Sequence, residues 1–324
     1  MIEINSLDAC SFRERDEIVA ALGSFDGLHL AHQRIIRACN ERARERGGMS
    51  VLFTFQNHPR TALNPGQPVP LLTPYALKLQ WIRRMNVGAA VGIPFDLSFS
   101  QIPAEVFIDE ILRGKLAAKE IVVGYNFRFG HDREGDAELL LSRVPSQFER
   151  VTVVQQQQDH DLTISSTVIR DIIAQGDLKK ASDLLGRPYQ VAGIVIQGDG
   201  RGKSIGLPTA NLDVSEQVIP PGGVYGVRVR LDALEAPPLW GVMNVGFVPT
   251  FKLNASPRCE VHLLDYDDDL YGRYVIADIL LHLRNERKFS GKDELLAQIR
   301  QDILQFQKWI AEQTDVSPVV WNDE

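Results

Sequence analysis

The chain has 324 residues, of which 44% are hydrophobic and 24% charged, and its formal net charge at pH 7 is −7. The composition excludes disorder as a description of the whole chain, and the length accommodates two domains. The acidic balance disfavours a general binder of nucleic acid or anionic membranes. The three cysteines form no CxxC pair, and neither a signal peptide nor a membrane-spanning apolar run is recognisable. We therefore expect a cytoplasmic protein without a membrane partner.

Strands and helices alternate along the first half of the sequence. The apolar patterns predict strands over 17–22, 50–55, 89–93 and 120–123, a further strand ending at 154, and helices over 30–46, 77–85 and 103–112. Repeated units of this kind predict a doubly wound parallel sheet, whose ligands bind at the C-terminal ends of the strands. Two short helices follow, one capped by Ser166 and one running from Asp177 to Gly186.

The pattern changes near Gly186 and Arg187, where we place the boundary between domains of residues 1–186 and 187–324. Short alternating strands punctuated by glycine and proline then predict an antiparallel barrel or sandwich. A last helix is predicted over 292–312. Its apolar residues recur at steps of three and four, so one face should pack on the strands.

A segment rich in glycine and histidine, GSFDGLHLAHQ, joins the first strand to the first helix. His29 and His32 are three residues apart, so they share a face if this turn is helical. A helix N-terminus with two imidazoles can bind phosphate, although two ordinary surface histidines beside a turn would give the same pattern. A second segment, ISSTVIR at 164–170, places three hydroxyl groups before a helix and Arg170 one turn later. That set can bind an anion, or the hydroxyls can simply cap the helix.

The second half carries a different set of polar groups. The sequence GDGRGKSIG at 198–206 has the spacing of neither a Walker loop nor a dinucleotide fingerprint, so it is either a phosphate-binding arch or a hairpin loop. Thr209 and Asn211 offer neutral oxygens on one side of an extended chain, which suits Mg²⁺ already bound to ATP. Glu260 stands in an otherwise apolar strand, where a carboxylate could act as a general base toward a hydroxyl group.

Together these segments resemble the bacterial bifunctional riboflavin kinase/FMN adenylyltransferases. The first half resembles their nucleotidyltransferase signature, with Ala31 where a glycine is usual. The second half resembles their kinase in GDGRGKSIGLPTANL, GVYGV, MNVGFVPTF and CEVHLLDYDDDLYG, with Lys203 replacing a frequent arginine. The resemblance implies a Rossmann-like nucleotidyltransferase domain followed by a Greek-key β-barrel with a C-terminal helix.

The resemblance also implies roles for individual residues. Glu260 would be the base of the kinase, Thr209 and Asn211 would bind magnesium, and His29, His32 and Arg170 would act on ATP during adenylyl transfer. Residues expected to bind ATP or its phosphates are Gly23, Ser24, Phe25, Asp26, Gly27, Ser165, Ser166, Thr167, Gly198, Gly200, Arg201, Gly202, Lys203 and Gly206. Residues expected near the flavin are Asn126, Arg284 and Glu286.

The expected function is therefore the conversion of riboflavin to FMN and of FMN to FAD, with riboflavin, FMN and ATP as substrates and Mg²⁺ as the metal. Alternatives are a chain that keeps one of the two activities, or a flavin-binding regulatory protein. A barrel that binds nucleic acid is disfavoured by the acidic charge. The sequence leaves the oligomeric state open between a monomer and a weak homo-oligomer.

Overall fold

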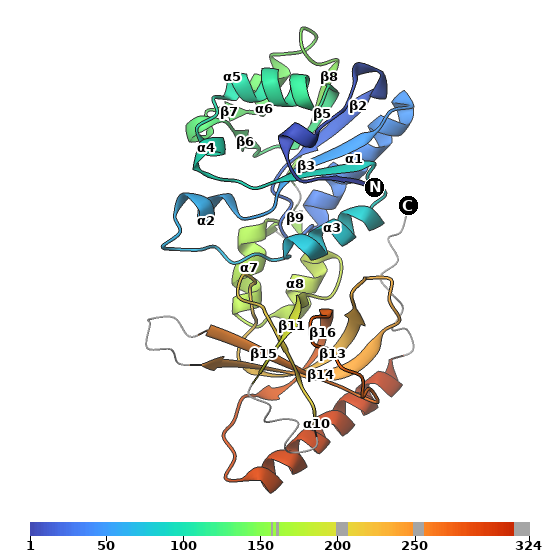
Figure 1. Cartoon of the computed structure of the whole chain (residues 1–324), viewed down its shortest axis with the longest axis vertical. Coiled ribbons are helices and arrows are strands. Elements are labelled where there is room, and N and C mark those ends of the chain that lie inside the picture. The colour runs from blue at the N-terminus through green and yellow to red at the C-terminus, as the bar shows by residue number, and fades with distance from the viewer. Residues whose placement is uncertain (157, 160–161, 199–206, 249–255, 314–324) are drawn as a thin grey trace. The chain divides into compact units, whose positions relative to one another are not determined.

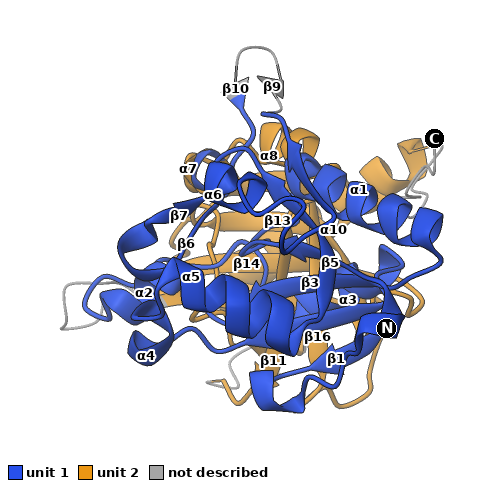
Figure 2. Cartoon of the chain, turned by 90° about the horizontal axis from the view of Figure 1, so that it is seen from above, with its two compact units in different colours: residues 1–168 blue, residues 169–324 orange. Residues whose placement is uncertain are grey.

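The computed structural model describes residues 1–156, 158–159, 162–198, 207–248 and 256–313. The chain forms two compact units, residues 1–168 and 169–324 (Figure 2). The predicted functional division at residues 186 and 187 stays a prediction. Within the described part of the chain, no helix combines the length and apolar character needed to cross a bilayer.

The first unit is built on a six-stranded parallel sheet in the order β1-β4-β3-β2-β5-β8 (Figure 1). Its strands are β1 (Ile2–Ile4), β2 (Ile18–Leu22), β3 (Ser50–Phe55), β4 (Ala89–Ile93), β5 (Ala118–Gly124) and β8 (Arg150–Val154). The predicted parallel sheet is thus confirmed. After β2 the chain adds β3 and β4 on one side, and β5 then pairs with the other side of β2. This reversal of strand order lies between β2 and β5, and in open α/β sheets the crevice that binds ligands is expected at the carboxyl ends of such a pair of strands.

Helices and short ribbons connect these strands. The helices are α1 (Leu30–Arg46), α2 (Pro59–Leu63), α3 (Tyr75–Arg84), α4 (Leu97–Ser100), α5 (Ala104–Val106), the π-helix η3 (Phe107–Lys115), α6 (Ala137–Leu141) and the 3₁₀ turns η1 (Leu7–Ala9), η2 (Glu14–Asp16) and η4 (His131–Arg133). The ribbons pair β6 (Arg128–Phe129) with β7 (Gly135–Asp136), and β9 (Gln158–Asp159) with β10 (Leu162–Thr163). Helix α7 (Ser166–Ala174) begins in the first unit and ends in the second.

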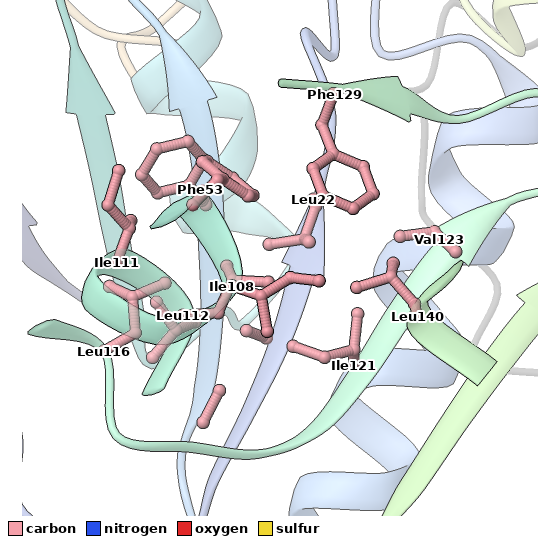
Figure 3. Close-up of a cluster of buried hydrophobic side chains, with 14 of the residues drawn as sticks. Leu22, Phe53, Ile108, Ile111, Leu112, Leu116, Ile121, Val123, Phe129 and Leu140 are labelled. Carbon is pink, nitrogen blue, oxygen red and sulfur yellow. The ribbon is translucent and has the colours of Figure 1, made fainter. Parts of the chain in front are cut away.

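Apolar side chains cover both faces of the parallel sheet. On one face Leu22, Phe53 and Ile121 meet the side chains of η3 (Figure 3). On the other face α1 packs against β2, β3 and β5, and Cys39 Sγ donates to the Val19 carbonyl at 3.2 Å. The two layers bury the central strands completely, so the loops at their ends are held by a rigid scaffold.

The predicted helix over 103–112 is interrupted. Its first turn, α5, is α-helical, whereas η3 has wider turns in which Leu116 N donates to the Ile111 carbonyl at 2.9 Å, five residues away. The buried residues Phe107, Ile108, Ile111 and Leu112 lie on one face of η3 and pack on the sheet. This spacing also fits an α-helix, so the pattern of apolar residues does not distinguish the two kinds of helix here.

The second unit is a closed antiparallel barrel in the order β11-β12-β15-β14-β13-β16 (Figure 1). Its strands are β11 (Gln190–Ile196), β12 (Ala210–Leu212), β13 (Gly223–Leu231), β14 (Leu239–Val248), β15 (Ser256–Leu263) and β16 (Tyr274–Asn285). Because β13, β14 and β15 pair consecutively and β16 returns to lie beside β13, the barrel contains the predicted Greek key.

Two helices flank the barrel strands in the chain, and both were predicted. Helix α8 (Leu178–Leu185) is capped by Asp177, which accepts from Lys180 N at 3.1 Å, and ends at Gly186 in a left-handed conformation. Helix α10 (Lys292–Glu312) lies along the outside of the barrel and buries Phe306 against β13 and β14. A Cβ at Gly226 would lie only 2.2 Å from the Phe306 ring, so this glycine makes room for the helix.

Candidate functional site

The segment between β2 and α1, residues 23–29, forms a tight loop at the crevice of the parallel sheet; we call it the β2–α1 loop. Phe25, Gly27 and Leu28 have φ values of 48°, 86° and 45°. Gly27 is also crowded, since an added Cβ would lie 2.7 Å from Leu72 Cδ1. The loop thus needs glycine at this point and holds two larger residues in an unfavourable backbone region.

Asp26 holds the β2–α1 loop in place through hydrogen bonds of its side chain. Its side chain is buried, and its carboxylate accepts the backbone N–H groups of Leu72 and Thr73, each at 3.0 Å. The carboxylate therefore fixes the loop to the segment that leads into α3. The sequence grouped Asp26 with phosphate-binding residues, but in the structure its side chain binds the protein backbone.

The two motifs predicted to share a site do meet in the structure. Ser166 Oγ donates to the Asp26 carbonyl at 2.9 Å, across 140 residues of sequence. Ser165 Oγ accepts from Val168 N at 3.4 Å, so the residue that caps α7 is Ser165 and the prediction of Ser166 was wrong by one position. Thr167 is exposed, and Arg170 lies one turn further along α7, beyond the division between the units.

The two histidines lie together at the start of α1. His29 caps the helix, with its Nδ1 accepting from His32 N at 3.3 Å, and the two rings stack with centroids 3.6 Å apart. Because Nδ1 accepts, a neutral His29 carries its proton on Nε2, which can then donate to a phosphate oxygen. The shared face predicted from their spacing is thus present.

His32 has a different environment. Burial, with the neighbouring His29 and Lys78, holds the pKa of the His32 imidazole well below its usual value. Its Nδ1 is buried and has no hydrogen-bond partner among the described residues. His32 is therefore neutral at pH 7 and contributes polarity and shape rather than positive charge. Ala31, where relatives usually have glycine, is simply a helical residue of α1.

Lys78 is a polar residue that the sequence reasoning missed. It lies in α3 with 2% of its surface exposed, and its Nζ donates to the Ser24 carbonyl at 3.0 Å and to the Phe55 carbonyl at 2.9 Å. One signal could have found it: Lys78 lies three and four residues before Trp81 and Ile82, on the face of the helix that is buried.

Asn126 lies beside the β2–α1 loop in the fold. It follows β5, which pairs with β2, and its side chain is exposed at the carboxyl end of the sheet. Its Oδ1 would lie 3.5 Å from a Cβ at Gly124, the last residue of β5. The expected role of Asn126 near the flavin stays a prediction.

In the barrel, strand register brings the second set of residues together. Asn211 of β12 lies opposite Glu260 of β15, which in turn lies opposite Asn244 of β14. Thr209 Oγ1 lies 3.5 Å from Glu260 Oε2, and Arg258 Nη1 lies 3.6 Å from Glu260 Oε1. The flanking Cys259 and Val261 are buried, so the polar row faces outward from the barrel wall. Asn244 was not singled out from the sequence.

Gly198 also belongs to this region. A Cβ at Gly198 would lie 2.1 Å from Asn211 Nδ2, so the glycine lets the chain after β11 pass directly over the amide. The other predicted phosphate-binding residues of this arch, Gly200, Arg201, Gly202, Lys203 and Gly206, lie outside the described residues.

The two expected flavin-binding residues after β16 have different environments. Arg284 Nε donates to both carboxylate oxygens of Asp302 at 3.1 and 3.0 Å and thereby joins β16 to α10. The Glu286 carboxylate lies near two glycines: a Cβ at Gly246 would be 3.2 Å from one oxygen, and a Cβ at Gly222 would be 3.4 Å from the other. Arg284 is thus paired with Asp302, whereas the Glu286 carboxylate lies next to the backbone of the two glycines.

The residues Thr209, Asn211 and Glu260 fit a magnesium ion in kind. Hydroxyl, amide and carboxylate oxygens are the hard ligands that Mg²⁺ takes, and the ion keeps several positions for water and phosphate. Among the described residues, no group of three or more histidine, cysteine, aspartate or glutamate side chains could hold a metal ion by itself. A metal here would therefore depend on ATP for further ligands.

A parallel sheet with a glycine-containing loop at the carboxyl ends of its strands, followed by a barrel that presents a carboxylate beside a threonine–asparagine pair, is the arrangement expected of a two-unit ATP-dependent transferase. Comparison with known proteins makes this more specific. A family model described as FAD synthetase matches residues 11–168, and one described as riboflavin kinase matches residues 185–310.

Whole-chain relatives agree with the two family models. The chain is 34% identical to the bifunctional riboflavin kinase/FMN adenylyltransferase of Bacillus subtilis, over 89% of this chain and 91% of that protein. It is 35% identical to the protein of the same name from Escherichia coli, over 93% and 95%. The chain therefore belongs to the bifunctional riboflavin kinase/FMN adenylyltransferase family, and the resemblance found in the sequence is confirmed.

A solved structure from Streptococcus pneumoniae shares the fold. It aligns with a TM-score of 0.80 and 31% identity, over 95% of this chain and 99% of that chain, and its title describes a macrolide-efflux protein. That title describes the other protein, and nothing in the sites above corresponds to it.

Proposed function

We propose that this chain makes FAD from riboflavin in two ATP-dependent steps and that each unit carries one step. The first unit would adenylylate FMN, and the barrel unit would phosphorylate riboflavin. The observation that carries this division is the hydrogen bond from Ser166 to the Asp26 carbonyl, which joins two distant motifs into one anion site far in sequence from Glu260. The functional domains would be residues 1–186 and 187–324, in the cytoplasm.

In the adenylyl transfer step, a phosphate oxygen of FMN attacks the α-phosphorus of ATP. The new P–O bond forms as the bond from the α-phosphorus to the α–β bridging oxygen breaks, and pyrophosphate leaves. Since the nucleophile is already an anion, the site needs donors and positive charge rather than a base. His29 Nε2–H and the start of α7 would bind phosphate oxygens, and Arg170 would neutralise the pyrophosphate.

The phosphoryl transfer step needs a base because the riboflavin 5′-hydroxyl is a poor nucleophile when protonated. Glu260 would accept the hydroxyl proton while the oxygen attacks the γ-phosphorus of ATP, and ADP leaves with the β–γ bridging oxygen. The ion pair with Arg258 and the approach of Thr209 orient the Glu260 carboxylate. Magnesium bound with ATP would neutralise phosphate charge, and Thr209 and Asn211 would hold it.

The two assignments can be tested on one purified chain. Glu260→Gln should lower FMN formation from riboflavin by at least 10²-fold, within the range expected for general-base catalysis, while adenylylation of supplied FMN stays within twofold. His29→Ala should have the opposite effect and lower FAD formation alone. Both reactions are followed by chromatographic separation of riboflavin, FMN and FAD in the presence of Mg-ATP.

The outcomes separate the proposal from its alternatives. Equal loss of both reactions, phosphorylation of riboflavin and adenylylation of supplied FMN, in either variant would contradict the division between units. Absence of both reactions in the unchanged chain would instead favour a flavin-binding regulator, and one missing reaction would favour a single-activity enzyme.

A further inference from the structure

Lys78 lies in an environment that is unfavourable for a lysine. It is on the buried face of α3 beside Leu77, Trp81 and Ile82, and burial lowers the pKa of its ammonium to about 8, an effect that nearby Asp26 partly opposes. An apolar residue would fill the same position of the helix without the cost of desolvating a charge. The contacts that Lys78 makes must therefore compensate for the cost of burying its charge.

Its contacts are two backbone carbonyls at the functional edge of the sheet. Ser24 is in the β2–α1 loop and Phe55 ends β3, and Lys78 Nζ bonds to both carbonyls at 3.0 and 2.9 Å. The Ser24 carbonyl also accepts from Thr54 Oγ1 at 2.9 Å. One ammonium thus ties together the ends of two neighbouring parallel strands just before the chain enters the ligand-binding edge.

Fixing the Ser24 carbonyl also fixes the next amide. The C=O and N–H of one trans peptide point in opposite directions, so a Ser24 carbonyl held by Lys78 turns the Phe25 N–H away from α3. Leu28 is held in a similar way, since its carbonyl accepts from Gln33 Nε2 at 2.8 Å. Side chains bound to inward carbonyls therefore set the direction of the loop's amides, which are the groups that recognise phosphate in such loops.

We propose that Lys78 is a positioning residue for adenylyl transfer, which holds the β2–α1 loop against the end of β3 and supplies the fixed positive charge beneath that loop. This inference rests on the proposed assignment of adenylyl transfer to the first unit. His32 cannot supply that charge because it is neutral at pH 7. Lys78 is protonated there, because its pKa of about 8 lies above the ambient pH.

Among the described residues, Asp26, His32 and Tyr75 are titratable groups that lie near Lys78. Asp26 lies in the loop above it, His32 on α1 feels its charge, and the Tyr75 ring centroid lies 5.8 Å from Nζ, one turn earlier on α3. Burial raises the pKa of the Tyr75 hydroxyl to about 12, so this group does not titrate near pH 8. An alkaline decline of adenylyl transfer that is present in the wild type and absent from Lys78→Met would therefore report Lys78.

The test uses the full chain and both of its reactions. Lys78→Met should lower kcat/KM for adenylylation of supplied FMN by 10²-fold or more, through a lower kcat as well as a higher KM for ATP. Riboflavin phosphorylation by the same molecules should stay within twofold. Lys78→Arg, which keeps a charged double donor, should recover at least tenfold of the loss. Lys115→Met, which removes a lysine from an exposed position of the same unit, should leave both reactions unchanged.

The pH profile supplies a readout that a purely structural role would not change. Wild-type adenylylation should fall above pH 8, and Lys78→Met should lack this decline. Adenylylation within threefold of wild type in Lys78→Met would overturn the proposal. If that variant fails to fold, a flat wild-type profile from pH 7 to 9.5 would overturn it equally. His29→Ala, assayed in parallel, keeps the two claims apart: if it retains adenylylation, the assignment of the unit fails, not only the role of Lys78.

Discussion

At the scale of single residues, polar side chains around the β2–α1 loop divide into those that build it and those that can face a ligand. Asp26, Ser166 and Lys78 all bind backbone groups of the loop or its neighbours. His29 differs, because its Nδ1 accepts from the helix backbone at the start of α1 and its ring stacks on that of His32. His32 belongs to neither category. Its ring stacks on that of His29 and meets that of Phe25 edge-on.

The burial of His32 predicts a pH-dependent stability of the first unit. Since its folded-state pKa lies well below 6.5, the unfolded chain binds more protons than the folded chain between these two values. Stability should therefore fall as the pH falls below about 6.5. One pH unit through this window corresponds to about 1.4 kcal/mol for one group, so we expect a loss of about 1 kcal/mol between pH 7.5 and 5.5.

The measurement is urea unfolding of wild type and His32→Asn at both pH values. The asparagine keeps a polar side chain that does not titrate, so the pH-dependent part should be smaller in the variant by that amount. The same pH dependence in both proteins would show that His32 does not charge on unfolding in this window.

These residues show how far the sequence determined the site. Residue type and spacing marked His29, Ser166, Thr209 and Glu260 as candidates, and the family resemblance supplied their expected roles, which stay predictions. The sequence could not separate residues that bind ligands from those that bind the loop, since Asp26 acts on N–H groups 46 and 47 positions away. The register that places Asn244 opposite Glu260 arises only when β14 and β15 pair.

At the scale of elements, α10 is attached to the barrel by an apolar cluster around Phe306 and by an ion pair at Asp302. Phe306 is fully buried, with its ring centroid 6.0 Å from that of Trp240 and 5.8 Å from that of Trp309. Asp302, one turn earlier, is buried in its ion pair with Arg284 of β16. The helix thus covers the outer faces of β13, β14 and β16. The row of residues that starts at Glu260 of β15 continues across these strands, beginning with Asn244 of β14.

Phe306→Ala should remove the apolar contact and destabilise the second unit by about 3–5 kcal/mol, the usual cost of deleting a buried phenylalanine. Riboflavin phosphorylation should be lost at a lower temperature than in wild type. The matched control is Leu304→Ala on the same helix, whose side chain is 64% exposed and whose loss should change stability by less than about 0.5 kcal/mol. Thermal unfolding followed by tryptophan fluorescence compares the two variants, and equal shifts would contradict the role of Phe306.

Element prediction succeeded where a local pattern decides the structure. The limits of α10 match the predicted range, and the cap at Asp177 and the stop at Gly186 are as expected for α8. The sequence did not predict β1, because its three residues are too few to show an alternating apolar pattern. This strand forms only by pairing with β4. The sequence also predicted an α-helix over 103–112, where the structure has the π-helix η3, because the spacing of the buried residues fits both kinds of helix.

At the scale of the whole molecule, two chemistries are carried by two units with separate cores. The first unit holds the β2–α1 loop and the start of α7, and the second holds the Thr209–Asn211–Glu260 row. Arg170 is the one proposed catalytic group of the first reaction that lies beyond the division, two residues into the second unit on α7. Because the product of one reaction is the substrate of the other, FMN must travel from the barrel to the parallel sheet.

A mixture of two single-site variants tests whether this transfer needs one chain. His29→Ala should make FMN only, and Glu260→Gln should adenylylate FMN only, so neither should form FAD from riboflavin alone. Mixed in equal amounts with Mg-ATP, they should restore FAD formation after a lag in which free FMN accumulates, since each set of groups can bind FMN from solution. Chromatography of samples taken over time measures the lag, and adding FMN at the start should abolish it.

The contradicting outcome is a mixture that accumulates FMN without forming FAD, while Glu260→Gln still adenylylates added FMN at higher concentration. That result would mean that FMN is passed within a single molecule before it equilibrates with solvent.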